Sequence, residues 1–206
     1  MVQLTVEEQN WLKDNHPEMI YDAEKLTITG PFHLDRSYKG KNIRDTFEIK
    51  IDLHKSPNRQ DYPVIYNTDG RIQKIACKKK LPLADLHIYN DDSLCLGLPE
   101  RFCEYYPEGL TLQDIFKHLT EHLYWVAYFD RYNNAPWEAE KHGNDAKRDY
   151  RVEKAIEGKD IEQLRSLHRE CCGRGIAMQK LRNYLNDSQL TLTLKKRLLS
   201  HGRTNS

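Results

Sequence analysis

The segment from Thr46 to Leu53 constrains the fold more than any other part of the sequence, because apolar and polar side chains alternate in it without an error. Charged side chains occupy the positions between four apolar ones, which are Phe47, Ile49, Ile51 and Leu53. A period of two residues belongs to a strand that buries one face and exposes the other. Strands of this kind are typical of antiparallel sheets. We therefore predict an antiparallel sheet.

Further strands are predicted on both sides of this segment. The apolar side chains of residues 26–34 share one parity, and Gly30-Pro31 in their midst predicts a bend or a bulge. Residues 62–67 form the next predicted strand, and a tight turn at 68–70 leads to an extended segment at 71–76. Three or four antiparallel strands in a meander follow from this pattern.

Two helices are predicted before residue 135. Thr5 and Glu8 form a capping box that begins a short helix, and this helix ends before Pro17. Thr111 is the predicted N-cap of a long helix that runs towards Arg131. The second half of this helix is apolar nearly all round, so we expect it to be covered on both sides. The apolar stripe along the helix consists of Ile115, Phe116, Leu119, Leu123, Val126 and Ala127.

Two other parts of the chain differ in character. Residues 78–107 mix Pro, Gly, Asn and Asp with short apolar pieces and show no sustained period, and an irregular segment of this length in a compact domain is usually functional. Later residues are charged and Leu-rich. We therefore predict an α+β domain of residues 1–143 and a helical C-terminal extension of residues 144–206. Helices are expected in the extension at 148–157, 160–170, 176–185 and 193–199.

Composition excludes several classes of protein. The 32 Lys and Arg residues nearly balance 31 Asp and Glu residues, so there is no bulk attraction to nucleic acid or to a membrane surface. The apolar runs are far shorter than the ~20 residues that span a bilayer, and the first residues lack the pattern of a signal peptide. Five Cys residues without a framework spacing favour a reducing compartment. We expect a cytoplasmic protein that has neither nucleic acid nor membrane as a partner.

Cys95 is the first candidate for chemistry. It lies in the irregular segment, eight residues after His87. The reactivity of a thiol can be used where it is partly exposed beside a His. The alternative is a small buried apolar side chain, which is the common fate of a cysteine outside a disulfide. The local sequence leaves both interpretations open.

Other patterns predict no metal or cofactor. His118 and His122 are one helical turn apart, but a Glu does not follow the first His, so an ordinary surface pair is favoured. His168, Cys171 and Cys172 do not supply the four ligands of tetrahedral zinc. A Gly-rich phosphate loop is also missing, so this chain is not expected to activate a substrate with ATP by itself.

The order of elements and several short motifs resemble those of ubiquitin-conjugating enzymes. Residues 87–98 look like the active-site flap of that family, with Leu94-Cys95-Leu96 in place of its Ile-Cys-Leu. Tyr62-Pro63 and Leu110-Thr111 resemble the family's Tyr-Pro at the third strand and its Leu-Thr at the start of the helix after the catalytic Cys. The similarity covers roughly residues 5–143.

Within this family the chain is most similar to the bacterial branch, which is linked to antiphage defence operons. Residues 137–143 resemble a Trp-Pro…Glu…His-Gly segment of that branch. Two motifs differ from the family pattern. Tyr105-Tyr106-Pro107 replaces the Trp-Ser-Pro of eukaryotic members, and there is no His-Pro-Asn before the Cys. His87 occupies the slot of the family's Asn, and Asn90 lies only five residues before Cys95.

The resemblance implies a ubiquitin-conjugating-enzyme-like fold and a set of roles for the flap. Cys95 would carry an activated protein C-terminus as a thioester and pass it to a lysine amine. His87, or alternatively Asn90, would donate a hydrogen bond to the tetrahedral oxyanion. Asp91 and Asp92 are near enough in sequence to receive the amine and aid its deprotonation. The alternative for these two carboxylates is a solvated turn.

The resemblance also implies the partners. A separate activating enzyme would use ATP, so no cofactor is expected on this chain. The cargo would be a ubiquitin-like protein or the C-terminus of a cGAS-like nucleotidyltransferase from a cyclic-oligonucleotide antiphage system, and the acceptor a lysine-bearing target. The alternative function is a non-catalytic binding or adaptor module of the same fold, a class that lacks the nucleophile, whereas Cys95 is present here. A thiol redox protein is disfavoured because the sequence has no Cys-x-x-Cys.

Overall fold

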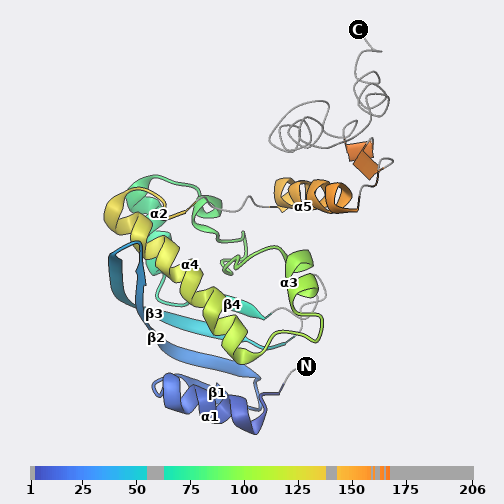
Figure 1. Cartoon of the computed structure of the whole chain (residues 1–206). Coiled ribbons are helices and arrows are strands. Elements are labelled where there is room, and N and C mark those ends of the chain that lie inside the picture. The colour runs from blue at the N-terminus through green and yellow to red at the C-terminus, as the bar shows by residue number, and fades with distance from the viewer. Residues whose placement is uncertain are drawn as a thin grey trace, which may run out of the picture. The chain divides into compact units, whose positions relative to one another are not determined.

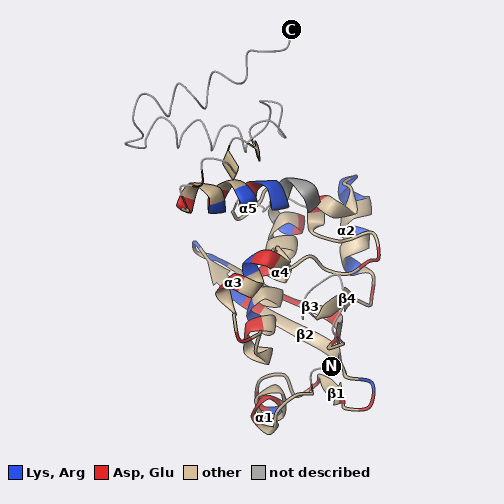
Figure 2. Cartoon of the chain, turned by 90° about the vertical axis from the view of Figure 1, so that its right-hand side faces the viewer, with Lys and Arg blue, Asp and Glu red and all other residues tan. Residues whose placement is uncertain are grey.

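The computed structural model describes residues 3–54, 63–137, 143–158, 160, 163–164 and 166–167 of the chain (Figure 1). The chain divides into two compact units, Met1–Glu140 and Lys141–Ser206. Acidic and basic side chains occur on the same elements, as the near-zero net charge predicts (Figure 2). Among the described helices, none combines the length and the apolarity of a membrane-spanning segment.

The first unit contains one antiparallel sheet of four strands in the order β1-β2-β3-β4, so the predicted meander is confirmed. The strands are β1 (Ile20–Asp22), β2 (Thr27–Tyr38), β3 (Lys41–Asp52) and β4 (Val64–Asn67). The alternating apolar side chains of residues 46–53 are at most 5% exposed. β1 was not predicted, and Tyr62, the expected start of the last strand, lies outside the described residues.

The bulge expected at Gly30-Pro31 is absent. β2 and β3 pair without interruption from Thr27–Asp52 to Tyr38–Lys41. Gly30 has a φ of +140°, and a Cβ atom there would lie 2.6 Å from the carbonyl oxygen of Glu18. The glycine is therefore required because the backbone just before β1 approaches this strand closely.

α4 (Leu112–Tyr132) crosses one face of the sheet and contacts β2 and β3 (Figure 1). Its predicted start is confirmed, because Thr111 forms a capping box with Asp114. The six side chains of the predicted apolar stripe are at most 7% exposed. The four successive residues 124–127 are also buried, as expected for a helix that is covered on more than one side.

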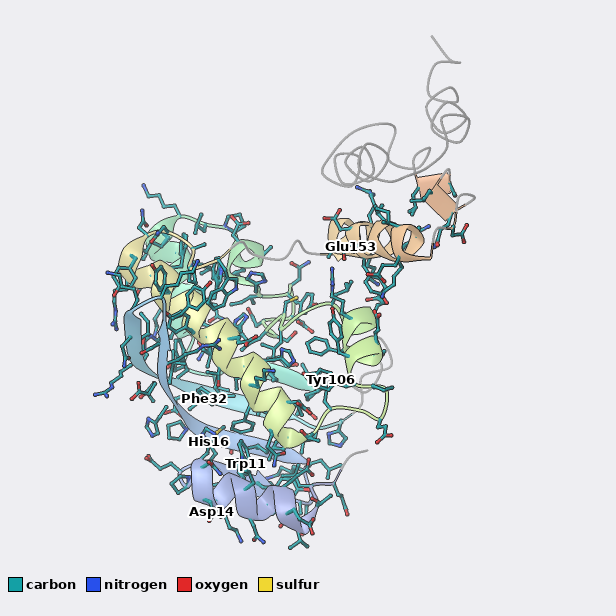
Figure 3. All side chains as sticks on the ribbon, in the orientation of Figure 1. Trp11, Asp14, His16, Phe32, Tyr106 and Glu153 are labelled. Carbon is teal, nitrogen blue, oxygen red and sulfur yellow. The ribbon has the colours of Figure 1, made fainter. Side chains whose placement is uncertain are left out.

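α1 (Val6–Asn15) begins at the predicted capping box of Thr5 and Glu8 and ends before Pro17. His16 caps its C-terminus, and the imidazole lies among three aromatic rings. The ring centroids of Trp11, Phe32 and Phe116 are 5.5, 5.3 and 4.5 Å from it. Figure 3 shows His16 between α1 and the sheet, so this cluster joins the helix to β2 and α4.

Residues 71–76, which we predicted to be extended, belong to α2 (Arg71–Lys79). The buried side chains of this helix are Ile72, Ile75 and Ala76, a spacing of three and four residues that fits a helix and not a strand. The helix is only nine residues long, so the apolar pattern is too short to decide between the two periods.

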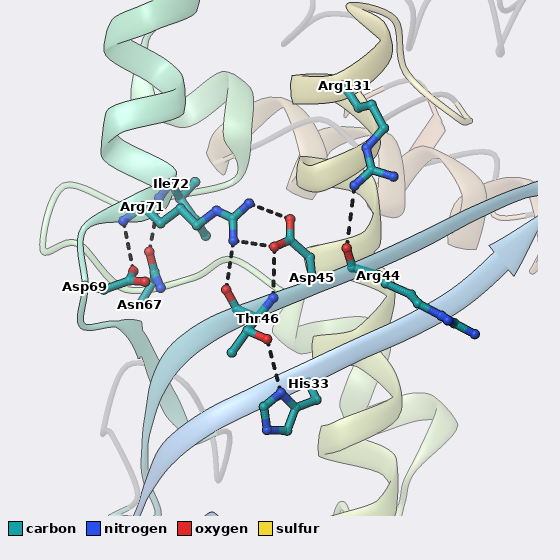
Figure 4. A network of polar contacts seen from close by, with 9 residues as sticks. All are labelled: His33, Arg44, Asp45, Thr46, Asn67, Asp69, Arg71, Ile72 and Arg131. Carbon is teal, nitrogen blue, oxygen red and sulfur yellow. Dashed lines mark hydrogen bonds and ion pairs between the residues drawn. The ribbon is translucent and has the colours of Figure 1, made fainter.

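Polar contacts hold the start of α2 against β3 (Figure 4). The guanidinium of Arg71 forms a two-pronged ion pair with the carboxylate of Asp45 and donates to the Thr46 carbonyl oxygen at 2.8 Å. The Asn67 side chain accepts from the Ile72 N–H at 3.0 Å. These contacts position α2, and with it the segment that follows.

The segment 78–107 is less irregular than predicted. It contains the end of α2, the 3-10 helix η1 (Leu83–Leu86) and α3 (Pro99–Tyr105). Pro99 stands at the first position of α3, where its missing N–H costs nothing. Both helices are too short for their periods to be visible in the sequence, and residues 87–98 are the longest stretch of this segment without helical structure.

The second unit contains α5 (Gly143–Glu157), which confirms the helix expected at 148–157 and begins earlier. Within this unit Val152, Ala155, Leu164 and Leu167 are buried. The helices predicted at 176–185 and 193–199 lie outside the described residues. The division at residue 143 into a catalytic domain and an extension stays a prediction.

Candidate functional site

Residues 87–95 form a short hairpin, which we call the flap hairpin. Ile88 and Leu94 face each other in an antiparallel bridge. The Tyr89 N–H donates to the Ser93 carbonyl oxygen at 2.9 Å. The predicted flap is therefore a two-stranded element with a defined register.

The flap hairpin docks on the outer edge of β4. The Leu94 N–H donates to the Ile65 carbonyl oxygen at 2.7 Å, and Ser93 forms a bridge with Tyr66. Ile88, Ser93 and Leu94 are at most 4% exposed. The hairpin thus extends the sheet by one short, well-buried strand.

The three residues Asn90, Asp91 and Asp92 form the tip of the flap hairpin. The Asp92 N–H donates to the Tyr89 carbonyl oxygen at 3.0 Å, and Asp92 has a φ of +63°. This is a hydrogen-bonded β-turn whose last residue is left-handed, in a three-residue hairpin loop. Asp91 Oδ1 accepts from the Ser93 N–H at 3.2 Å and from the Ser93 hydroxyl at 2.5 Å. All three tip side chains are exposed, and Asp91 also stabilises the turn.

His87 and Cys95 face each other at the base of the flap hairpin. The Cys95 N–H donates to the His87 carbonyl oxygen at 2.7 Å, and the His87 N–H donates to the Ala84 carbonyl oxygen of η1 at 3.0 Å. His87 has a φ of +58°. Both backbone groups of His87 are therefore engaged, and its conformation links η1 to the flap hairpin.

Cys95 is half-buried, which differs from the fully buried apolar alternative. Its thiol is 3.9 Å from the Gly97 carbonyl oxygen, within reach of a weak S–H···O hydrogen bond. Asn90 is far from it by comparison. At roughly 3.3 Å per residue the tip lies about 7–10 Å along the hairpin from Cys95. The structure thus joins His87, and not Asn90, to Cys95 by a backbone hydrogen bond.

The His87 ring packs on α4, a contact that the sequence did not predict. Its centroid lies 5.3 Å from that of Trp125 and 6.0 Å from that of His122, both in edge-to-face geometry. Trp125 and His122 are 7% and 8% exposed. The interpretation of His122 as a surface residue was therefore wrong. The apolar run in this half of α4 could have indicated that His122 is buried. It does not indicate which side chain of α4 contacts the flap hairpin.

His118, the other member of the predicted pair, lies in a different environment from His122. Its Nε2 is 3.0 Å from the hydroxyl of Tyr106, and its ring packs edge-on against Phe102 at 4.8 Å. Among the described residues, no group of three or more His, Cys, Asp or Glu side chains is arranged to hold a metal ion. His168, Cys171 and Cys172 lie outside the described part of the chain.

α3 packs against the segment that follows Cys95. Gly97 has a φ of +154°, and a Cβ atom there would lie 2.8 Å from the Phe102 ring. Phe102 in turn stacks on Tyr106, which lies near α3 and α4 in Figure 3. The position of residues 96–98 is therefore set by an aromatic ring of α3.

The flap hairpin and η1 carry exposed carboxylates. Asp85 in η1 is exposed, as are the two tip carboxylates, Asp91 and Asp92. Lys78 and Lys79 at the end of α2 pair with α4, where the Lys78 amine is 2.9 Å from the Asp130 carboxylate.

No family model, curated protein or solved structure matches this chain. The structure itself establishes an α+β protein with an N-terminal helix, a four-stranded antiparallel sheet and a later long helix.

Proposed function

We propose that this protein is a ubiquitin-conjugating-enzyme-like acyl transferase with the corresponding fold. It carries an activated protein C-terminus as a thioester on Cys95 and transfers it to a lysine amine. The main support is the half-buried thiol of Cys95, paired with His87 at the base of a hairpin on the sheet edge. The N-terminal helix, the four-stranded antiparallel sheet and the later long helix are compatible with that family, and the motifs described above support it.

Loading is a thioester exchange. A thiol with a pKa of ~8.5 is only a few per cent ionised at neutral pH, so the step depends on the thiolate of Cys95. The thiolate attacks the carbonyl carbon of the thioester on the activating enzyme. The tetrahedral oxyanion then collapses and expels the thiolate of that enzyme. In the later transfer to the amine, His87 is the nearest candidate to donate a hydrogen bond to the oxyanion of that step.

Transfer forms an amide bond. The lysine nitrogen attacks the carbonyl carbon on Cys95, the C–S bond breaks, and Cys95 leaves as a thiolate. The nitrogen loses a proton, for which Asp91 and Asp92 are the proposed acceptors through an intervening water, because the tip lies about 7–10 Å along the hairpin from Cys95. Asp92 suits this role better, because one oxygen of Asp91 already accepts two hydrogen bonds from Ser93.

We place this activity in the cytoplasm of a bacterium, in antiphage defence. The cargo is a ubiquitin-like protein or the C-terminus of a cGAS-like nucleotidyltransferase, and a separate activating enzyme consumes the ATP. The chain itself then needs no cofactor. These assignments rest on the resemblance in residues 5–143.

The test incubates the full chain with activating enzyme, ATP and each cargo in turn, followed by a non-reducing gel. One cargo is expected to give an adduct that thiols cleave. Cys95→Ser should give a thiol-resistant ester or no adduct, whereas Cys77→Ser and Cys103→Ser, at two exposed cysteines, should leave the adduct unchanged. An adduct that depends on Cys103 would overturn the assignment. Binding of a cargo without any adduct would favour the adaptor module.

A further inference from the structure

We propose that Trp125 is a positioning residue, whose indole holds the imidazole of His87 beside Cys95 and thereby controls how readily the thiol reacts. This inference deepens the proposed function and rests on its choice of Cys95 as the nucleophile. It gives α4 a role in the site, which the sequence motif of the flap does not indicate.

The backbone contacts of His87 fix its main chain, and its ring has contacts of its own with α4. The His87 N–H and carbonyl oxygen bond to Ala84 and Cys95, so the hairpin keeps its register whatever the ring does. The ring orientation is set by packing. The plane of the His87 ring makes an angle of 81° with the Trp125 ring and of 78° with the His122 ring. Aromatic pairs prefer this edge-to-face arrangement.

Trp125 is itself held firmly and can serve as a fixed wall. Its ring stacks on Phe129 one turn later, at 5.4 Å and an interplanar angle of 3°. Its indole N–H donates to the Trp137 carbonyl oxygen at 3.2 Å. Because α4 is also packed on the sheet, the position of the His87 ring is set before any cargo binds.

The ring orientation matters because His87 and Cys95 meet at the base of the flap hairpin, where the Cys95 N–H donates to the His87 carbonyl oxygen at 2.7 Å. An imidazole at this place accepts the thiol proton or, once protonated, stabilises the thiolate. A ring that swings away loses both effects. Trp125 therefore acts on Cys95 only through His87.

Other titratable groups lie near this pair and do not change between the variants below. They are His122 on α4, Asp85 on η1, and Asp91 and Asp92 at the tip of the flap hairpin.

The experiment measures how fast iodoacetamide alkylates the full chain as a function of pH, without activating enzyme. The thiolate displaces iodide, and peptide mass spectrometry reports Cys95, Cys77 and Cys103 separately. Trp125→Leu should slow alkylation of Cys95 by ~10-fold at neutral pH and move its pH profile up by about one unit, while Cys103 is unchanged. Trp125→Phe, which keeps an aromatic edge, should restore most of the rate.

A double-mutant cycle supplies the decisive control. In a His87→Ala background, Trp125→Leu should have no further effect on Cys95. An equal slowing in both backgrounds, or a Trp125→Leu profile that superimposes on wild type, would overturn the proposal. If Trp125→Leu fails to give a cooperative melting curve, Trp125→Phe carries the test, with a 2–3-fold slowing expected that again vanishes in His87→Ala, and an unchanged rate would then overturn the proposal.

The two proposals fail separately. A Trp125 effect on alkylation with no cargo adduct would remove the conjugating function and keep the positioning role. A cargo adduct on Cys95 with no effect of Trp125→Leu on alkylation would keep the conjugating function and remove the positioning role.

Discussion

His87 contributes to the site through its backbone and through its ring, and substitution can separate these two contributions. Its backbone closes the base of the flap hairpin, while its ring faces α4. A side-chain substitution leaves the backbone hydrogen bonds in place, provided that the new residue tolerates a φ of +58°. Asn adopts this left-handed region more readily than most residues and retains a hydrogen-bond donor.

His87→Ala should slow discharge of a loaded Cys95 to an amine by ~10²–10³-fold, the usual effect of removing one oxyanion donor. Loading should fall by no more than ~10-fold, the part that thiol reactivity carries. Single-turnover rates beside a melting curve provide the measurement. His87→Asn is the matched control and should keep more of the discharge rate. Discharge of the Ala variant at the wild-type rate would remove His87 from the mechanism.

Gly97 offers a second test at the level of one residue. Gly97→Ala pushes a methyl group into the Phe102 ring and strains the backbone, so the free energy of unfolding should fall by about 1–3 kcal/mol. Cys95 alkylation should change as well, because its thiol faces the Gly97 carbonyl. Gly109→Ala is the control: its φ is +96°, but nothing lies within 4 Å of the added Cβ. Urea unfolding of both variants separates clash from strain, and equal losses would contradict this account.

The local sequence singled out the segment that holds His87 and Cys95, but not its contacts with α4. The structure joins these two residues by a backbone hydrogen bond, while their joint role stays a prediction. Trp125 and His122 lie about 30 residues further on. Their contact with His87 depends on how α4 lies across the sheet, and no local period encodes this.

At the scale of the elements, the stability of the packing between α1 and its neighbours depends on pH. The dependence arises from His16 in the aromatic cluster. Burial lowers the pKa of His16 below its usual value near 6.5, and the neighbouring His33 lowers it further. Glu18 is 2.9 Å from the His33 ring and faces the same region. The unfolded chain therefore binds a proton on His16 more readily than the folded chain does.

The fold should consequently lose stability as the pH falls through about 6.5 and below, and regain it above that value. Urea unfolding at several pH values between 5 and 8 measures this loss, and the chosen range brackets the usual His pKa of ~6.5. His16→Phe keeps the aromatic packing and should flatten the profile. His33→Gln removes the second cause and should reduce the loss only in part. An unchanged slope in His16→Phe would exclude this histidine as the origin.

At this scale the errors of prediction concern short elements. α4 and β3 were predicted because they are long and strongly periodic. β1 has three residues with Ile20 exposed, and α3 has seven, so neither shows a period. α2 was assigned to the wrong class for the same reason. Tertiary contacts such as the Arg71–Asp45 pair then decide what the local sequence leaves open.

For the whole molecule, the core predicts that the first unit is self-sufficient. Every buried member of the main hydrophobic cluster lies between Leu4 and Ala127. A chain of residues 1–140 should therefore unfold cooperatively, with Cys95 alkylation within about twofold of the full-length rate. Circular dichroism melting and the alkylation assay measure this. An aggregated or molten fragment would show that residues beyond 140 complete the core.

The flap hairpin has a consequence for the solubility of the folded protein. By bonding to Ile65 and Tyr66, it occupies the outer edge of β4, where unpaired N–H and carbonyl groups would otherwise invite pairing with a neighbouring chain. The segment that carries the thiol thus also covers the edge of the sheet. An opening of the flap hairpin that breaks the Leu94–Ile65 hydrogen bond exposes the edge of β4, where another chain can pair. Movements of the reactive segment that are larger than this therefore promote aggregation.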